Sequence, residues 1–414
     1  MTSLPLFLNK KELLYTLLAV VILFCLSLSY EFYKYKKTTA YSLHVTTAKV
    51  QNKYQKLSKK GKLYTVYKLK NSDFSFYTVN WKALHVEIGD SLEVGFYTDK
   101  IDFYSYLKGF YVTSKFINVK SKKQINALVD FIENQHQNEL AKELYKALYF
   151  ATHISSDLRE DISKWGIAHL VAISGFHLGI LSSILFFLLR PMYGFFQDRY
   201  FPYRNKSADL TFFVFMILGM YAYFIDFNPS VLRAYIMSLV AFFLFSKNIK
   251  IISFATLFFT MSIVLILSPK LIFSIAFWFS LFGVFYIFLF LHHFSNLSKL
   301  SMFILLHFWV FVLMLPVVHF VFNIFSFYQF LSPLISMLFL LFYPLSLALH
   351  VSGFGDVLDS MLIWFFSLHV ETLSLTTPLW FLFSYVVLSL LAIRFRFVAL
   401  LLPLFALSLG LVLI

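Results

Sequence analysis

The sequence predicts a polytopic α-helical membrane protein of about 11 spans, with a small extracytoplasmic β-barrel domain inserted after the first span. Composition carries the membrane assignment, because 59 % of the 414 residues are hydrophobic and only 14 % are charged. An ordinary soluble domain is about 45–50 % apolar and about 25 % charged. The mean hydropathy of +0.75 and the 54 Phe residues exclude soluble globular and disordered proteins. A lysine-rich stretch with strand-like alternation near the N-terminus predicts the β domain.

The first element is a membrane anchor over residues 1–30. Lys10 and Lys11 precede an apolar stretch that contains Cys25, the only cysteine of the chain. A single cysteine excludes an internal disulfide and any metal site built from several cysteines. The bulky residues around Tyr30 lack the small-residue pattern of a signal-peptidase site. We therefore expect the anchor to be retained.

Residues 31–120 form the second element, the predicted β domain. Lysines alternate there with β-branched and aromatic residues, and turn signals such as Lys60-Gly61 and Gly89-Asp90 separate the runs. Five strands are expected, near residues 41–51, 62–70, 73–79, 91–97 and 110–119. Five short strands in about 90 residues favour an OB-like barrel, although an SH3-like barrel would produce much the same pattern.

Residues 121–165 are predicted to form an amphipathic helical connector of two helices, because Leu140, Leu144 and Leu148 recur at helical spacing. Residues 166–414 are predicted to form a helical membrane domain. Ten spans are expected there, at residues 167–189, 210–225, 231–246, 251–268, 272–291, 302–322, 326–349, 359–375, 379–393 and 397–414. Most can cross about 30 Å of hydrocarbon, but the second and third are short. The segment 359–375 carries polar residues, so it either crosses the membrane or lies in its interface.

The distribution of positive charge predicts the orientation of these spans. With the N-terminus in the cytoplasm and residues 31–165 outside, 11 Lys and Arg residues of the short loops and termini lie inside. Only Lys270 lies outside. This asymmetry agrees with the positive-inside rule and predicts an extracytoplasmic C-terminus.

Polar residues within apolar spans mark candidate functional positions, because a charge at the bilayer centre costs about 2.5–3.5 kcal/mol on insertion scales. The first cluster places His169, Ser174, Gly175 and His177 in the first half of one expected span. Glycine lets the backbone open or lets another helix approach closely. The cluster indicates either a broken helix beside a cavity or an ordinary helix-packing face.

The second cluster links the two short spans and runs from Asp226 through Asn228, Pro229 and Ser230 to Arg233. Pro229 suits a helix start, and Asn228 or Asp226 suits its cap. Arg233 then enters the membrane one turn later. Its side chain either faces a hydrated path and attracts phosphate, or pairs with Asp226 as a structural ion pair. Short, proline-interrupted segments point to a transport site.

Three segments, in this order along the chain, carry a family resemblance. Residues 169–179 read HLVAISGFHLG, residues 229–234 read PSVLRA, and residues 273–280 read FSIAFWFS. They resemble the HLLAISGLHVG signature, the PSVLRA motif and the GFQLS segment of the ComEC competence family. Trp278 stands in place of the Gln of GFQLS, and Ala276 in place of its Gly. The resemblance covers roughly residues 31–345.

This resemblance implies an inner-membrane channel that conducts single-stranded DNA from the periplasm to the cytoplasm during natural transformation. The implied partners are single-stranded DNA, a periplasmic DNA receptor or uptake machinery, a cytoplasmic motor or single-strand-binding protein, and the lipid bilayer. The residues expected to line or shape the channel are His169, Ser174, Gly175, His177, Asn228, Pro229, Ser230 and Arg233.

The basic outer domain is the expected collector of DNA. Residues 31–120 hold 16 Lys and Arg against 7 Asp and Glu, a net charge of +9, and phosphate charge dominates DNA binding. Stacking of bases on aromatic side chains needs no sequence preference. Alternatively, the aromatics only reflect strand preference and the lysines only solvate the domain. The candidate DNA-binding residues are Lys53, Tyr54, Lys62, Tyr64, Tyr67, Lys68 and Trp81.

The sequence contains neither a Walker A motif nor the His-x-His-x-Asp-His metal motif of the metallo-β-lactamase-like domain that many family members carry. We therefore expect a channel rather than an enzyme, with no cofactor or metal, and a separate nuclease. Two alternatives stay open. One is a small-molecule or lipid exporter, and the other is an intramembrane serine hydrolase that uses Ser174 with His177 or His169.

Overall fold

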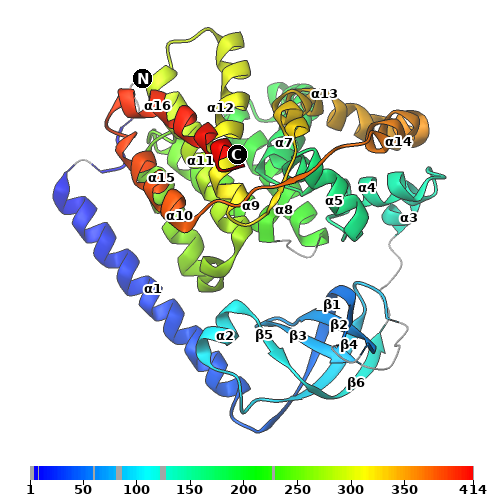
Figure 1. Cartoon of the computed structure of the whole chain (residues 1–414). Coiled ribbons are helices and arrows are strands. Elements are labelled where there is room, and N and C mark those ends of the chain that lie inside the picture. Colours follow the sequence, from blue (N-terminus) through cyan, green and yellow to red (C-terminus); the bar gives the residue numbers. More distant parts are fainter. Residues whose placement is uncertain are drawn as a thin grey trace. The chain divides into compact units, whose positions relative to one another are not determined.

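The computed structural model describes residues 4–7, 9–58, 61–80, 86–121, 127–225 and 229–413. The chain divides into two compact units, whose helices and strands are drawn in Figure 1. The β unit comprises Phe7–Ala127 and Ser262–Ser274, and the helical unit comprises Met1–Leu6, Leu128–Met261 and Ile275–Ile414. The predicted DNA-collecting surface and the two polar clusters therefore belong to different units.

The β unit begins with α1 (Lys10–Thr38), a helix of 29 residues. Asn9 caps it, because the Asn9 Oδ1 accepts a hydrogen bond of 2.8 Å from the Glu12 N–H. None of its most apolar 18-residue window is buried within the chain, which leaves those side chains to lipid. The helix continues past the predicted anchor boundary at residue 30, since the Tyr35 hydroxyl donates to the Ile101 carbonyl at 3.0 Å. Its last turns thus belong to the β domain.

A curled sheet follows α1 (Figure 1). In the described residues it has six strands: β1 (Leu43–Leu57), β2 (Leu63–Lys70), β3 (Ser75–Asn80), β4 (Ser91–Tyr97), β5 (Phe110–Val112) and β6 (Ser114–Ser121). Their order is β5-β3-β2-β1-β4-β6, and each pairing is antiparallel except the parallel β3–β5 pair. One short segment, β5 plus β6, therefore pairs at both edges and curls the sheet. All five predicted strands are present, the last one as β5 and β6.

The inner face of this sheet holds an aromatic core. The Phe76 ring is fully buried, with its centroid 5.0 Å from that of Phe96 and 5.9 Å from that of Phe110. α2 (Phe103–Lys108) contributes Tyr106, which is 1 % exposed and contacts Phe74 at 5.6 Å. Burial of these large rings is the main term that stabilises a domain of this size.

The helical unit opens with three connector helices rather than the two predicted: α3 (Ala127–Glu133), α4 (Glu139–Phe150) and α5 (Ser156–Lys164). Local capping explains the breaks. Asn138 Oδ1 accepts from the Leu140 N–H at 2.8 Å, and Ser155 Oγ accepts from the Leu158 N–H at 3.3 Å. Ala151 ends α4 in the left-handed conformation, at φ 54°.

The remaining helices, whose sequences are mostly apolar, are drawn in Figure 1. They are α6 (Ala168–Val171), α7 (Gly175–Tyr200), α8 (Lys206–Phe224), α9 (Pro229–Ser246), α10 (Phe254–Leu267), α11 (Ile275–Phe294), α12 (Lys299–His319), α13 (Ser332–Val351), α14 (Asp359–Ser367), α15 (Leu379–Leu391) and α16 (Arg396–Leu407). Short 3₁₀ turns lie at η1 (Pro269–Phe273), η2 (Phe327–Leu331), η3 (Gly355–Leu358) and η4 (Ser408–Leu413). A two-residue ladder joins β7 (Ile324–Phe325) to β8 (Leu373–Ser374).

Six helices in the described part of the chain are long and apolar enough to cross a membrane, and four further apolar helices are shorter. The chain is therefore a helical membrane protein with a β domain, but 11 crossings are not confirmed. Two of the segments expected as spans are not continuous helices. The segment 359–375 is helical only as α14, whose nine residues reach about 14 Å. The segment 167–189 is broken after Val171 and resumes at Gly175.

Candidate functional site

The break between α6 and α7 is made by Ser174 and His177. The backbone of Ser174 is extended, at φ −134° and ψ 179°, and its N–H donates to the His177 Nδ1 at 3.2 Å. Such side-chain bonds to the backbone compete with a continuous helix. Since Nδ1 accepts, a neutral His177 ring carries its proton on Nε2. Ser174 and His177 thus form a cap at the start of α7, and Gly175 is its first residue.

The second ring nitrogen of this histidine, Nε2, is buried. His177 is 0 % exposed, and its Nε2 has no hydrogen-bond partner among the described residues. The rings of Phe339 and Tyr343 on α13 stand edge-on to it, with centroids 5.3 and 5.0 Å away. A buried donor left unpaired costs about 1–3 kcal/mol. This cost marks His177 as a functional candidate rather than a simple packing residue.

The second polar cluster lies beside the first. α9 begins at Pro229, and its Arg233 is 6 % exposed. The Nε and Nη1 atoms of Arg233 have no hydrogen-bond partner in the described part of the chain. A Cβ added at Gly175 would lie 3.5 Å from the Ala234 Cβ, so the first turn of α7 packs on the first turns of α9. An alanine at position 175 would make an ordinary van der Waals contact there, so this packing does not depend on the glycine.

One apolar cluster holds both segments together. It buries Ile173 and Leu178 from the first segment with Val231 from the second. The fold therefore brings the two predicted clusters into one site. Ser230 lies in the first turn of α9, whereas Asp226 and Asn228 lie outside the described residues, so neither the predicted cap nor the predicted ion pair is described.

Sequence reasoning missed the role of α13, whose buried stripe receives the first polar segment. Its Ser336 Oγ lies 3.0 Å from the His169 Nε2 and donates to the Ser332 carbonyl at 2.8 Å, so it accepts the His169 N–H. Ser332 Oγ in turn donates to the Gly166 carbonyl at 3.0 Å. The members of the stripe recur every four or three residues: Ser332, Ser336, Phe339, Tyr343, Ser346 and His350. This spacing of small polar and aromatic residues in an apolar helix was the signal available.

Strand pairing sorts the predicted surface residues of the β unit into two faces. Lys53 is directly opposite Tyr67, and opposed residues share a face. Tyr67 is 1 % exposed in the aromatic core. The expectation that Tyr67 belongs to a stacking surface is therefore corrected, because the pleat turns its ring inward. Lys53 lies near the rim, where its Nζ donates to the Val86 carbonyl at 2.7 Å.

The opposite face of β1, β2 and β3 carries three further predicted residues, Tyr54, Tyr64 and Lys68. It also carries two residues that were not predicted, Lys56 and Tyr77. Lys56 is opposite Tyr64 and Lys68 is opposite Tyr77. Lys56 Nζ lies 5.5 Å from the Tyr54 ring centroid, and Lys68 Nζ lies 5.8 Å from that of Tyr77. Burial lowers the pKa of the Lys68 ammonium. We call this set the lysine–tyrosine face: Tyr54, Lys56, Tyr64, Lys68 and Tyr77. Lys62 is exposed just before β2, and Trp81 lies outside the described residues.

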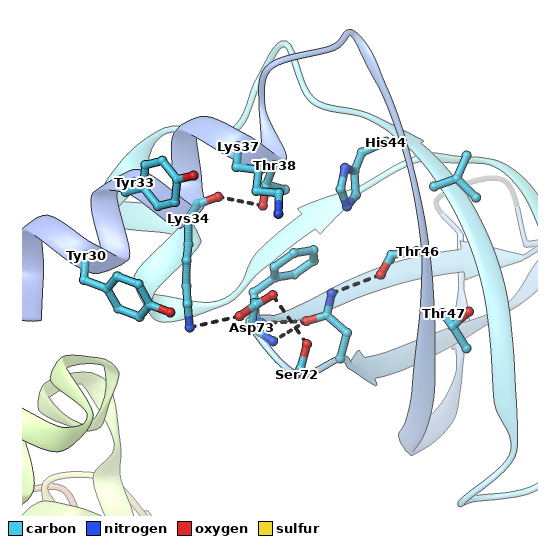
Figure 2. Close-up of a pocket in the computed structure, with 13 residues that line it drawn as sticks. Tyr30, Tyr33, Lys34, Lys37, Thr38, His44, Thr46, Thr47, Ser72 and Asp73 are labelled. Carbon is cyan, nitrogen blue, oxygen red and sulfur yellow. Dashed lines mark hydrogen bonds and ion pairs between the residues drawn. The ribbon is translucent and has the colours of Figure 1, made fainter.

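A cavity of about 470 Å³ lies between the end of α1, β1 and the β2–β3 turn (Figure 2). Lys34 Nζ forms an ion pair of 3.0 Å with Asp73 at its edge. Asn71 Oδ1 holds the turn by accepting from the Asp73 and Phe74 N–H groups at 2.8 and 2.7 Å. Burial lowers the pKa of the His44 imidazole, which is therefore neutral at pH 7. The ion pair fastens α1 to the sheet.

Comparison with known proteins identifies the family. The family model for the competence protein matches residues 150–413. The chain belongs to the competence protein family. The match runs from the end of α4 through α16, so it includes the capped break, Arg233 and the α13 stripe.

An uncharacterized protein of Aquifex aeolicus (strain VF5) is 32 % identical over 139 residues, which are 33 % of this chain and 30 % of that protein. The chain therefore matches less than a third of the length of this relative. No solved structure matches the chain.

Proposed function

We propose that this protein conducts single-stranded DNA across the bacterial inner membrane, from periplasm to cytoplasm, during natural transformation. The carrying observation is that two family segments far apart in sequence meet at Gly175 and Ala234. This contact brings α9, which carries the buried Arg233 in its second turn, against the first turn of the long helix α7. Helix N-termini and arginine donors both attract phosphate. A polyanion needs such donors along a hydrated path.

We propose that single-stranded DNA binds first to the lysine–tyrosine face. Lys56 and Lys68 offer ammonium groups to phosphates, while Tyr54 and Tyr77 offer rings for base stacking. The curled sheet supports an OB-like assignment, because a single segment pairs in parallel with β3 and antiparallel with β4. OB-like barrels are common platforms for single strands.

The proposed orientation puts the N-terminus in the cytoplasm and residues 31–165 outside. One contact within the β unit supports it. Lys270 of η1 lies 2.7 Å from the Glu31 carboxylate and donates to the Asp73 carbonyl. This contact supports a topology in which the loop between α10 and α11 lies on the same side of the membrane as the β domain, as the charge asymmetry predicts. A periplasmic DNA receptor or uptake machinery would deliver the strand.

The proposal assigns no catalytic step to this chain. A cytoplasmic motor or a single-strand-binding protein would draw the strand inward. The hydrolase alternative has a weaker basis. Ser174 Oγ lies 3.2 Å from the His177 Nδ1, but that atom already accepts from the Ser174 N–H. Such a mechanism also needs a group that orients the base, and the His177 Nε2 has no partner among the described residues.

The test follows fluorescent duplex DNA in a deletion strain of the source bacterium, scoring periplasmic uptake and cytoplasmic entry separately. We expect DNA to accumulate outside the inner membrane, with transformation lost and restored by the wild-type gene. Normal entry into the cytoplasm would reject the channel. Accumulation of a small molecule or lipid instead, with normal transformation, would favour the exporter.

The lysine–tyrosine face makes a separate prediction. Tyr54→Ala combined with Tyr77→Ala should weaken binding of single-stranded DNA by the purified full-length protein at least about tenfold, since stacking contributes about 1–3 kcal/mol per base. Tyr41→Ala is the matched control, because Tyr41 is 78 % exposed and outside the sheet. Fluorescence anisotropy at fixed salt measures both. If the double variant bound single-stranded DNA as tightly as the Tyr41→Ala control, the lysine–tyrosine face would not be a DNA-binding surface.

A further inference from the structure

A buried cluster of titratable side chains lies away from both family segments. His136 follows α3, His350 lies in the last turn of α13, and Asp359 is the first residue of α14. All three are buried, with exposed fractions of 3 %, 0 % and 9 %. His136 Nδ1 lies 2.9 Å from each carboxylate oxygen of Asp359, and His136 Nε2 lies 2.9 Å from His350 Nε2. His136 is more than 200 positions away from His350 and Asp359 in the sequence, and it meets them only in the fold.

The cluster is packed between the connector and α13. The Tyr145 ring of α4 stacks on His136 at 4.7 Å and stands edge-on to His350 at 4.4 Å. Gln135 adds two hydrogen bonds, donating to the His350 carbonyl at 3.1 Å and accepting from the Gly355 N–H at 2.9 Å. The connector and α13 are therefore packed closely against each other and share one hydrophobic cluster.

The geometry fixes where the protons are. His350 Nδ1 lies 2.6 Å from the Ser346 carbonyl, which can only accept, so this nitrogen carries a proton. A neutral His350 then accepts at Nε2, and His136 Nε2–H must donate to it. The remaining proton is shared between His136 Nδ1 and the Asp359 carboxylate. The three side chains thus hold three protons and no net charge.

A metal ion does not explain this arrangement. The described residues contain no group of three His, Cys, Asp or Glu side chains that could hold one. The 2.9 Å separation of the two Nε2 atoms is that of a direct hydrogen bond.

We propose that His136, His350 and Asp359 form a proton-sharing clasp that positions α13 against the connector and releases it when the clasp takes up one more proton. The extra proton would go to His350 Nε2. Two N–H donors, those of His350 and His136, would then face each other, and the cluster would gain one positive charge. The hydrogen bond between the two rings is lost. The three residues are positioning residues and touch no substrate in this proposal.

Release of α13 from the connector would affect the candidate site, because α13 also contacts the family segment of residues 169–179. The stripe that ends at His350 contacts His169 through Ser336, and His177 through Phe339 and Tyr343. A shift of α13 therefore reaches both histidines of the site. This step rests on the proposed function, whereas the clasp itself does not.

Other titratable groups surround the clasp and are accounted for. On α4, Tyr149 donates to Ser346 Oγ at 2.8 Å, and Tyr145 stacks as described. Lys146 of α4 pairs with Glu133 of α3 at 3.0 Å. Asp356 lies in η3, and the other charged residues of α3 and α4 are Asp130, Glu139, Lys142 and Glu143. His153 follows α4 in the connector, where its Nε2 lies 2.9 Å from the Arg159 guanidinium. Histidine is the side chain whose unperturbed pKa lies between about pH 5 and 8, so the His350 variants below assign the response in that range to the clasp.

The test is hydrogen exchange of α3 and α4 in the full-length protein in lipid nanodiscs, without DNA, corrected for the intrinsic effect of pH. We expect protection to fall at least about tenfold between about pH 7.5 and about pH 5.5. His350→Gln keeps an acceptor near the Nε2 position but cannot titrate, so its protection should stay flat. The shorter side chain of the His350→Asn variant can bond to the Ser346 carbonyl but cannot reach His136. This variant should therefore show low protection at both pH values.

The matched control is His307→Gln, because the His307 Nδ1 makes the same bond to a preceding carbonyl, that of Phe303, at 2.7 Å. It should keep the wild-type response. A wild-type protein whose protection does not change with pH would overturn the proposal even if no variant folds. So would a His350→Gln variant that keeps the full pH response. Neither result depends on whether the protein conducts DNA.

Discussion

Replacing Arg233 with Met should reduce transformation at least about 100-fold while the protein still inserts and folds. The lost factor corresponds to roughly 2.7 kcal/mol, within the range of charge-assisted contacts to phosphate. Arg233 is 6 % exposed with two nitrogens unpartnered among the described residues. Removing a buried charge of this kind does not destabilise the fold, because its desolvation cost is removed with it. The measurement is transformation frequency together with the melting temperature of the purified protein.

The same variant separates the two sequence interpretations of this residue. If Arg233 instead paired with Asp226, Arg233→Met would leave a carboxylate buried alone and lower the melting temperature. Arg233→Lys is the matched control, since it keeps the charge and should retain part of the activity. Normal transformation by Arg233→Met would show that the pathway does not need this side chain.

His177→Asn should also block DNA entry without unfolding the protein. The Asn side chain can still accept from the Ser174 N–H, so the cap of α7 is kept, but the Nε2–H is lost. We expect transformation to fall at least about tenfold, the effect of losing one hydrogen bond to a charged group. His177→Leu also removes the cap and should cost about 1 kcal/mol of stability.

The control for this prediction is His319→Asn. His319 is 1 % exposed, and its Nε2 likewise has no partner among the described residues, but it lies on α12. It should transform as the wild type does. Comparable losses in both variants would mean that any buried histidine is needed for folding, and would remove the special role of His177.

The sequence alone predicted the class of the protein and much of its local structure. Hydropathy and positive charge depend only on composition along the chain, so they indicated a membrane protein whose anchor corresponds to α1. Alternation and turn residues are also local, and all five predicted strands are present. The family segments were found because they are contiguous, and the family match over residues 150–413 confirms the resemblance.

Other features were beyond the reach of local patterns. Both faces of β2 carry a tyrosine, and the pairing with β1 and β3 together with the aromatic core shows that Tyr67 points inward and Tyr64 does not. Residues 359–375 are apolar enough for a span, yet the chain leaves the helix after Ser367 and is extended at β8. Hydropathy measures a preference for lipid and not the backbone conformation.

The tertiary structure decided which polar residues meet. Ser174 and His177 are close in sequence, and their contact was foreseeable from helical spacing. Gly175 with Ala234, His169 with Ser336, and His136 with His350 join segments from about 60 to more than 200 residues apart. No local rule predicts such contacts, because they depend on which helix faces pack together. The candidate site and the clasp exist only through the packing of α13 on the connector and on the start of α7.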